Sequence, residues 1–381
     1  MPSPGVIIAH AVRLALEQGY NEASSGGMAL VSDVGEIIGH SQILSVLDRA
    51  VVNGRVRHAY LLSGPSQVGK ARIARWLAMR LNCLRDPSPC GQCSTCVRIL
   101  RGVHPDVRSL QVGGNRDDAL GLPLEQSERT GRAVERSISI EKVRALQHDA
   151  SLSPGEANWK VYLIISAEQL TIPAANCLLK TLEEPPEHVV LVLTVPDGVD
   201  LLPTIVSRCQ VMRIGFVPSV ETARALITSF EVEPMRAETL ARLAGGRPGW
   251  AIQALTDDDV LQERERAIAD VTTSSRPGYR DRLGVAERLA SGYSRDQASV
   301  FQAISLWQTW WWDVYLIQLG CADLVANVDR LDTLESFAKQ APNVAVVSYL
   351  RDLETASRRL VQNVNPRLAL EALLVRSPVI R

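Results

Sequence analysis

A glycine-rich loop between an apolar run and a helical run is the feature that most constrains this chain. Residues 58–62 read HAYLL, which predicts a short buried strand, and residues 64–70 read GPSQVGK. Residues 70–82 follow with the spacing of a helix. A strand, a glycine loop and a helix in this order predict a phosphate-binding loop, in which backbone N–H groups and a lysine surround an anion.

Most parts of such a loop are present. Gly64 and Gly69 permit the turn, and Lys70 adds a full positive charge. The next residue is Ala71, which has no hydroxyl, whereas this position normally supplies a ligand of Mg²⁺. Thr194, in a later apolar run, completes the candidate nucleotide-binding residues.

A loop that hydrolyses nucleotides also needs an acidic pair at the end of a neighbouring strand. One carboxylate holds the metal and the other polarises the attacking water. The candidate strand covers residues 161–165, and Ile165 and Ser166 occupy the places where acids are expected. Glu168 comes two residues late, and we expect it to point elsewhere. The sequence therefore predicts that metal-assisted phosphoryl transfer lacks both of its protein anchors.

Four cysteines follow the predicted helix in a C-x6-C-x2-C-x2-C array, as Cys83, Cys90, Cys93 and Cys96. Four soft ligands with no open position are typical of structural Zn²⁺. A redox CxxC pair is the alternative, but it lacks the usual strand setting. We therefore expect a zinc module over residues 83–96.

Strands and helices alternate through the first half of the chain and give way to helices alone after about residue 216. Helical runs over 140–150 and 172–183 alternate along the chain with apolar runs over 161–165 and 189–195. This alternation predicts a parallel sheet with helices on both faces. We divide the chain into an N-terminal extension over 1–27, an α/β domain over 28–216, a helical domain over 217–275 and a second helical domain over 276–381.

Bulk charge excludes a global field that would attract nucleic acid or a membrane, because the net charge is −1 over 381 residues. Any contact with DNA must then come from a local basic surface. No signal peptide or membrane span is predicted, and the expected compartment is the cytoplasm. Trp307, Trp310 and Trp311 share one helical face, for which packing is favoured over a base-stacking platform.

Several longer motifs carry a resemblance to one family. They are GHSQI at 39–43, RHAYLLSGPSQVGK at 57–70, AANCLLKTLEEPP at 174–186, LPTIVSRC at 202–209 and NPRLAL at 365–370. In this order, and with the four-cysteine insert, they resemble the bacterial DNA polymerase III clamp-loader subunits, which are AAA+ proteins. The resemblance covers roughly residues 36–375. It implies an AAA+ P-loop sheet with a zinc-binding insert, then a small helical lid domain and an α-helical collar domain.

The family has two close branches, and three departures make this chain similar to the second. Tau/gamma chains are the ATPase motor and carry GKT or GKS, an acidic pair and a sensor arginine in the lid. Here those places hold Ala71, then Ile165 and Ser166, and finally Gly249, with Arg247 two residues early. Delta-prime chains resemble tau/gamma but usually cannot hydrolyse ATP.

The resemblance also implies a role for Arg208 in the Ser207-Arg208-Cys209 triplet. In the family this arginine reaches into the ATP site of the adjacent subunit and acts there as an arginine finger. Ser207 and Cys209 are expected to set the turn that aims it. A chain without its own ATPase activity would then still act in trans, as part of the DNA polymerase holoenzyme. The surviving loop leaves open whether ATP or ADP is held without hydrolysis.

The implied partners are the tau/gamma and delta subunits, the sliding clamp and, in the complex, primer–template DNA, with no membrane. Two alternatives stay open. An active tau/gamma-like ATPase would need Glu168 or another carboxylate to hold the metal. A zinc-dependent nucleic-acid binding protein on a relic nucleotide fold would bind DNA without partners and lose that affinity on chelation.

Overall fold

The chain forms two compact units in a computed structural model that describes residues 37–112, 137–197, 201–294, 296–362 and 364–380. The first, here called the sheet unit, takes in Val31–Glu231 and Gly246–Gly249. The second, the helical unit, takes in Val232–Gly245 and Trp250–Arg381. The expected extension over 1–27 lies outside the described residues, and the domain boundaries near 216 and 275 stay predictions.

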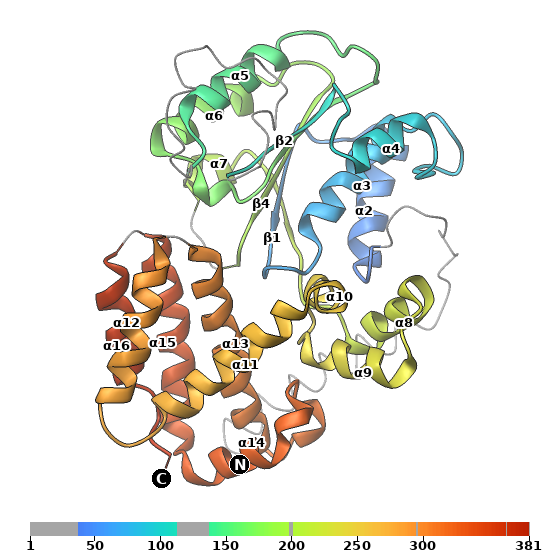
Figure 1. Cartoon of the computed structure of the whole chain (residues 1–381). Helices are drawn as coiled ribbons and strands as arrows, with labels where there is room; N and C mark the ends of the chain where they lie inside the picture. The colour runs from blue at the N-terminus through green and yellow to red at the C-terminus, as the bar shows by residue number, and fades with distance from the viewer. Residues whose placement is uncertain (1–36, 113–136, 198–200, 295, 363, 381) are drawn as a thin grey trace, which may run out of the picture. The chain divides into compact units, whose positions relative to one another are not determined.

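A five-stranded parallel sheet forms the centre of the sheet unit (Figure 1). Its strand order is β2-β3-β4-β1-β5. Its strands are β1 (Ala59–Ser63), β2 (Val107–Leu110), β3 (Lys160–Ile164), β4 (Val189–Val195) and β5 (Gln210–Arg213). The three strands expected from apolar runs are present within one residue of their predicted positions. No apolar run predicted β2 and β5, which are edge strands of four residues, two of them polar in each strand.

Helices cover both faces of this sheet, as the strand–helix alternation predicted. The connection from β1 to β2 crosses the sheet in one direction, and the later strand connections cross it in the other. Because such crossovers are right-handed, the helices between β1 and β2 lie on one face of the sheet and those of the later connections lie on the other. Leu62 and Val190 pack with the first face, and Leu61 and Leu191 with the second. The first face carries α2 (Ser41–Val52), α3 (Lys70–Asn82) and α4 (Ser94–Leu100); the second carries α5 (Ile140–Ala150), α6 (Ile172–Glu183) and α7 (Pro203–Val206). The sheet unit also contains the short helix η3 (Ala167–Gln169) and α8 (Ser219–Phe230).

A buried carboxylate, Asp106, ties the start of β2 to the loop that precedes β3. Its two oxygens accept hydrogen bonds from the backbone N–H groups of Gly155, Glu156 and Ala157, at 2.9, 2.8 and 3.0 Å. Burial alone would raise the pKa of Asp106, but these N–H groups hold it below its ordinary value. Glu156 also pairs with Arg98 on α4, so the same loop connects the cysteine segment to the sheet.

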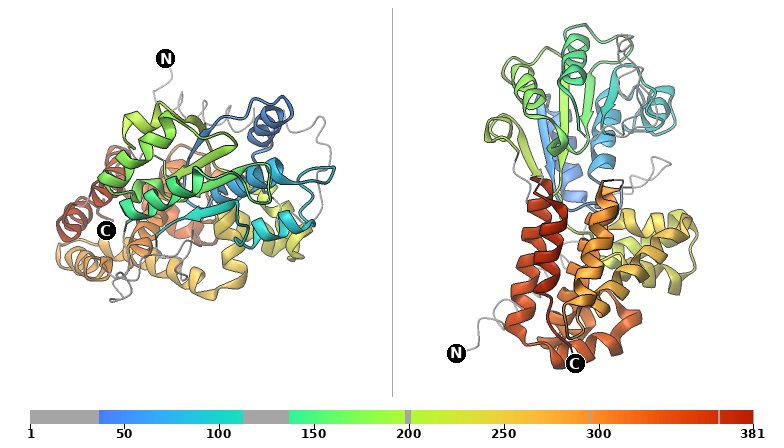
Figure 2. Two further views of the ribbon diagram at one scale, coloured as in Figure 1. Left: turned by 90° about the horizontal axis from the view of Figure 1, so that it is seen from above. Right: turned by 60° about the vertical axis from the view of Figure 1, so that its left-hand side comes forward.

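The helical unit is built around α13 (Gln297–Gln318), which packs against α11 (Asp258–Ser274), α14 (Leu331–Gln340) and α15 (Asn343–Val361). Figure 2 shows from two sides that this orange-to-red part of the chain contains only helices. The other helices that follow α8 in the chain are α9 (Pro234–Leu243), α10 (Pro248–Thr256), α12 (Arg280–Tyr293), η4 (Ala322–Leu324), η5 (Val328–Arg330) and α16 (Pro366–Val375). None of the helices in the described ranges is long and apolar enough to cross a membrane.

The tryptophan stripe on α13 is core, which confirms the packing interpretation. Trp307, Trp310 and Trp311 are each only 1% exposed, so their rings are not available to stack on bases. Trp307 donates its Nε1–H to the carbonyl oxygen of Ala267 at 3.0 Å, and Phe337 packs against the other two rings.

We expect Asp106→Ala to lower the free energy of unfolding of the sheet unit by about 2–4 kcal/mol, because three N–H groups lose a charged acceptor. Since the pKa of Asp106 is lowered on folding, its contribution is complete above the ordinary aspartate pKa and is lost as the pH falls through the lower folded value. Chemical denaturation at pH 7 measures the change, with Glu187→Ala, at an exposed position of the same unit, as control. Equal stability of the two variants would contradict this role.

Candidate functional site

The glycine loop lies at the carboxyl end of β1, with β4 and β5 on either side. The chain leaves β1 for the far strand β2, so this is a point where the direction of strand connection reverses, a usual ligand position in open parallel sheets. A Cβ atom on Gly64 would lie 2.0 Å from the carbonyl oxygen of Ile214, so only glycine fits there. Gly69 caps α3 with φ 109°, and a Cβ atom on it would meet nothing within 4 Å. The loop is thus tight at its start and open where α3 begins.

Lys70 folds back over the loop. Its Nζ donates to the carbonyl oxygens of Gly64 and Pro65 at 2.5 and 2.6 Å. Burial lowers the pKa of Lys70 to about 8, although Glu168 and Asp197 act to raise it. The lysine therefore stays largely cationic at neutral pH. Ala71 occupies the second position of α3 and offers no oxygen to a metal.

Glu168 lies close enough to Lys70 for the two charges to affect each other's pKa, and the expectation that it points away from the metal position stays a prediction. It lies in η3, which starts after Ser166 adopts a left-handed conformation with φ 58°. Burial raises the pKa of Glu168 to about 7, and Lys70 acts electrostatically to lower it. Its Oε2 is buried and has no hydrogen-bond partner among the described residues.

Thr194 supports this turn. Its Oγ1 accepts a hydrogen bond from the backbone N–H of Ser166 at 3.1 Å, and the residue is 3% exposed. Ile165 donates its backbone N–H to Leu110 on β2 at 2.9 Å. The carboxyl end of β3 therefore carries an apolar residue and a serine where an acidic pair was sought.

Gly249 also meets the loop. Its backbone N–H donates to the carbonyl oxygen of Gln67 at 2.9 Å, and a Cβ atom on Gly249 would lie 2.8 Å from that oxygen. No larger side chain fits at this position in the present backbone. Arg247 lies two residues earlier, and burial lowers its pKa.

The four predicted cysteines converge. The Sγ atoms of Cys83, Cys90, Cys93 and Cys96 all lie within 4.8 Å of one another. Cys83 Sγ is 3.5 Å from that of Cys90 and 3.9 Å from that of Cys93. Four sulfurs bound tetrahedrally at about 2.3 Å from one ion would be about 3.8 Å apart. The cluster therefore has the dimensions of a four-thiolate metal site.

Backbone N–H groups point at these sulfurs as they do at thiolate ligands. Cys93 donates to Cys90 Sγ at 3.3 Å, and Cys96 donates to Cys93 Sγ at 3.4 Å. Although burial acts to raise it, such hydrogen bonds lower the pKa of Cys90 to about 6. Burial raises the pKa of Cys96 well above the usual value, with further increases from the neighbouring cysteines. All four thiols can ionise together only beside a cation.

Arg208 lies after α7 in a compact turn. Its Nη2 pairs with Glu183 Oε1 at 2.7 Å, and its Nη1 donates to the carbonyl oxygen of Thr204 at 3.0 Å. Ser207 donates its hydroxyl to the same carbonyl at 3.1 Å. Burial raises the pKa of Cys209 to about 11, so this thiol stays neutral in the turn. The Arg208 side chain is 35% exposed, so part of it is accessible from solvent.

We expect about one Zn²⁺ per chain in protein purified under reducing conditions, and much less in Cys93→Ser. Loss of the metal should lower the melting temperature of the sheet unit by about 5 °C or more, since metal binding adds to folding free energy. Elemental analysis and calorimetry measure both effects. Cys321→Ser, which changes a cysteine outside the cluster, should match the wild type. Metal-free wild-type protein with an unchanged melting temperature would refute the site.

We expect the loop to bind ADP, with an affinity that falls by about tenfold between pH 6.5 and 8.5, because Lys70 loses its charge near pH 8 and Glu168 becomes negative near pH 7. Glu168→Gln should remove the lower of these two steps. Isothermal titration calorimetry measures the affinity of the wild type and of Glu168→Gln at each pH. The protonation of ADP affects both proteins equally, so it drops out of the ratio of their affinities. If the ratio of the wild-type affinity to the Glu168→Gln affinity does not change with pH, the charge of Glu168 has no effect on the loop.

Two family models match this chain. One is described as DNA polymerase III, delta subunit, and matches residues 39–217; the other is described as DNA polymerase III, delta subunit, C terminal, and matches residues 259–377. The two ranges together take up well over half of the chain and include the glycine loop, the cysteine cluster and Arg208.

Curated relatives come from both branches of the clamp-loader subunits. The chain is 27% identical to DNA polymerase III subunit delta' of Bacillus subtilis over 336 residues, which is 88% of this chain and 94% of that protein. It is 27% identical to subunit tau of the same organism over 84% of this chain and 49% of that protein. It is 36% identical to subunit gamma of Buchnera aphidicola over 48% of this chain and 45% of that protein. The chain thus spans about half the length of the tau and gamma relatives.

Solved structures align at lower similarity. A DNA polymerase III gamma subunit-related protein of Thermotoga maritima aligns with a TM-score of 0.41 and 18% identity, over 87% of this chain and 97% of that one. The DNA clamp loader delta protein of Bacillus subtilis aligns with a TM-score of 0.29 and 10% identity, over 87% and 98%. On the two family matches, and with a delta' relative aligned over nearly its full length, the chain belongs to the DNA polymerase III delta-subunit family and resembles its delta-prime members.

Proposed function

We propose that this chain is a delta-prime-type subunit of a bacterial DNA polymerase III clamp loader and does not hydrolyse ATP itself. One observation carries the proposal: the loop keeps its glycines and lysine, but both kinds of metal anchor are missing around it. Ala71 replaces the hydroxyl ligand, and Ile165 and Ser166 replace the acidic pair. Similarity to a delta' subunit over 94% of that protein supports the same assignment.

The loop would hold ATP or ADP as a structural ligand. Lys70 would move its ammonium from the carbonyl oxygens of the loop to the phosphates, and the open space beside Gly69 would admit them. The first N–H groups of α3 would complete the anion site. Without metal anchors, the bound nucleotide would stabilise the sheet unit rather than turn over.

A second candidate function, an active ATPase, rests on Glu168. Its buried, unpartnered oxygen and its pKa of about 7 make it an available carboxylate near Lys70. One carboxylate supplies either a metal ligand or a base for water, but phosphoryl transfer by this type of site uses both functions and a hydroxyl ligand. We therefore favour the non-hydrolysing assignment.

Arg208 would act on the neighbouring subunit. Its guanidinium is partly exposed and is held by one carboxylate, Glu183, on the surface of the sheet unit. A phosphate group on an adjacent subunit would replace Glu183, because it carries more negative charge and accepts the same two-pronged hydrogen bonding. An arginine supplied in trans in this way can raise phosphoryl transfer by about 10³–10⁵-fold.

The remaining parts have supporting roles in this proposal. The four cysteines would bind one structural Zn²⁺ and stiffen the segment between α3 and α4. Residues 217–275 would form a lid domain, and residues 276–381 a collar that joins the tau/gamma and delta subunits. The assembly would open the sliding clamp and place it on primer–template DNA in the cytoplasm.

The decisive experiment is DNA-stimulated ATP turnover by a complex reconstituted with tau/gamma and delta subunits. Arg208→Ala should lower turnover at the affected site by about 10³-fold without loss of assembly, and Arg208→Lys should recover little because lysine lacks the fork of donors. Arg224→Ala, at an exposed position on α8, is the matched control.

Two outcomes would overturn these assignments. Full turnover by an intact complex that contains Arg208→Ala would remove the trans role. Turnover by the isolated chain, lost in both Lys70→Ala and Glu168→Gln, would establish the active ATPase instead.

A further inference from the structure

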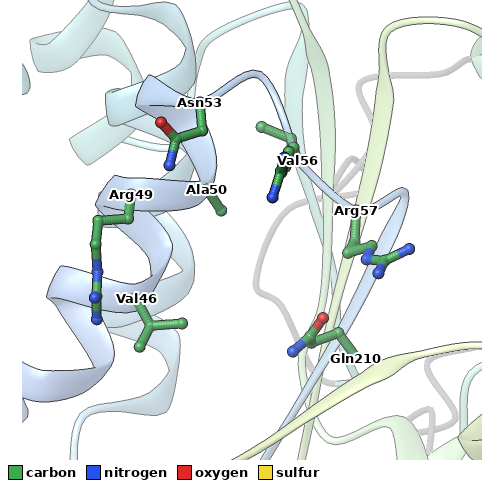
Figure 3. A pocket seen from close by; sticks show the side chains of 8 residues that line it. Val46, Arg49, Ala50, Asn53, Val56, Arg57 and Gln210 are labelled. Atoms are coloured by element: carbon green, nitrogen blue, oxygen red, sulfur yellow. The ribbon is translucent and has the colours of Figure 1, made fainter.

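A basic pocket lies at the amino end of β1, at the opposite end of this strand from the glycine loop. Its volume is about 580 Å³. The polar residues that line it come from α2 and its end, from the segment between α2 and β1, and from the start of β5: Arg49, Asn53, Arg55, Arg57 and Gln210. Figure 3 shows Arg49 and Asn53 on the helix at one wall, and Arg57 and Gln210 at the other. None of the features described so far uses this pocket.

The backbone that carries these arginines is fixed by hydrogen bonds. Gly54, with φ 64°, donates its N–H to Val51 at 3.1 Å, and Arg55 donates to Ala50 at 2.8 Å. These two bonds form a Schellman motif that ends α2. Arg57 donates its backbone N–H to the hydroxyl of Tyr60 at 3.0 Å. The three arginines therefore extend from an ordered backbone.

The pocket carries unbalanced positive charge. Arg49, Arg55 and Arg57 are exposed, and no acidic residue lines the pocket. Within the described ranges none of the three forms an ion pair with a carboxylate. By contrast, the nearby Arg80 pairs with Asp48 at 2.6 Å. In a chain of net charge −1, this is a local concentration of charge without internal compensation.

The partial negative charge at the carboxyl end of α2 balances only part of this positive charge. The carboxyl end of α2 offers about half a negative charge, which favours a single nearby cation such as Arg49. Arg49 also donates its Nε to the carbonyl oxygen of Ser45, on its own helix, at 3.2 Å. Arg55 and Arg57 leave a net positive surface that folding alone does not require.

The arrangement fits a polyanion better than a single ion. Arg49 and Arg57 lie on separate walls of the pocket, so one phosphate held by one wall would leave the other cation unused. A chain of phosphates places consecutive charges against both walls. Asn53 and Gln210 add neutral hydrogen-bond donors, which commonly contact phosphate oxygens and sugars.

We propose that this arginine pocket binds the sugar–phosphate backbone of DNA. The proposal goes beyond the clamp-loader assignment, which names no residue that contacts DNA; only the choice of DNA among phosphate chains rests on that assignment. Binding of this kind positions the strand and does not depend on its base sequence.

Fluorescence anisotropy of the full-length chain with labelled primer–template DNA, between 25 and 200 mM salt, tests the pocket. Three phosphate contacts predict a slope of about −2.7 for log Kobs against log salt. The triple variant Arg49→Gln, Arg55→Gln and Arg57→Gln should remove most of this slope and weaken binding at least tenfold at the lowest salt. A control triple of exposed arginines in the helical unit, Arg236→Gln, Arg266→Gln and Arg351→Gln, makes the same change in net charge and should bind as the wild type does.

Three results would overturn the proposal. They are no binding by wild-type protein at 25 mM salt, equal losses in the pocket and control variants, and displacement of DNA by inorganic triphosphate at a matched phosphate concentration. The last would assign the pocket to a small anion.

Subunit assembly is measured separately, by size-exclusion chromatography with tau/gamma and delta. A chain that binds DNA through the pocket but does not join those subunits would refute the proposed function and leave the pocket standing. A chain that assembles normally but binds DNA independently of the pocket would do the reverse.

Discussion

The sheet unit depends on the close approach of backbone to backbone at the end of β1. Gly64 lies so near the carbonyl oxygen of Ile214 that no Cβ atom fits, and Ile214 in turn donates its N–H to Ser63 at 2.7 Å. Gly246 meets the side chain of Phe216 in the same way. At each contact the absence of a side chain on glycine lets the neighbouring residue approach closely. Together the two contacts fix the start of the loop and the segments beside it.

The residues needed to bind an anion at this loop are present, whereas the expected residues needed to hydrolyse a nucleotide are not. The anion cradle needs only glycines, a helix start and Lys70, all of which persist. Hydrolysis needs oxygen ligands placed at a second strand, and Ile165 provides none. Burial raises the pKa of Glu168 to about 7, so about half of this carboxylate is charged at pH 7. In the proposed function, this site therefore holds phosphates and does not cleave them.

Sequence reasoning predicted the features that local pattern determines. Continuous apolar residues over 189–195 predicted β4, and cysteine spacing predicted the cluster. It missed β2 and β5, because four-residue edge strands carry too little periodicity. It also did not predict the short helix η3, which carries Glu168. The arginine pocket was out of reach because Gln210 joins it from a strand that the sequence did not reveal.

The distribution of indole rings has a practical consequence. Five of the seven tryptophans belong to the helical unit, and three of them form its centre. Intrinsic fluorescence is therefore mainly a signal from that unit, whereas Co²⁺ substituted for Zn²⁺ at the cysteine cluster would give visible absorbance from the sheet unit alone. The two optical signals together can show whether the two halves of the chain unfold in one transition or in two.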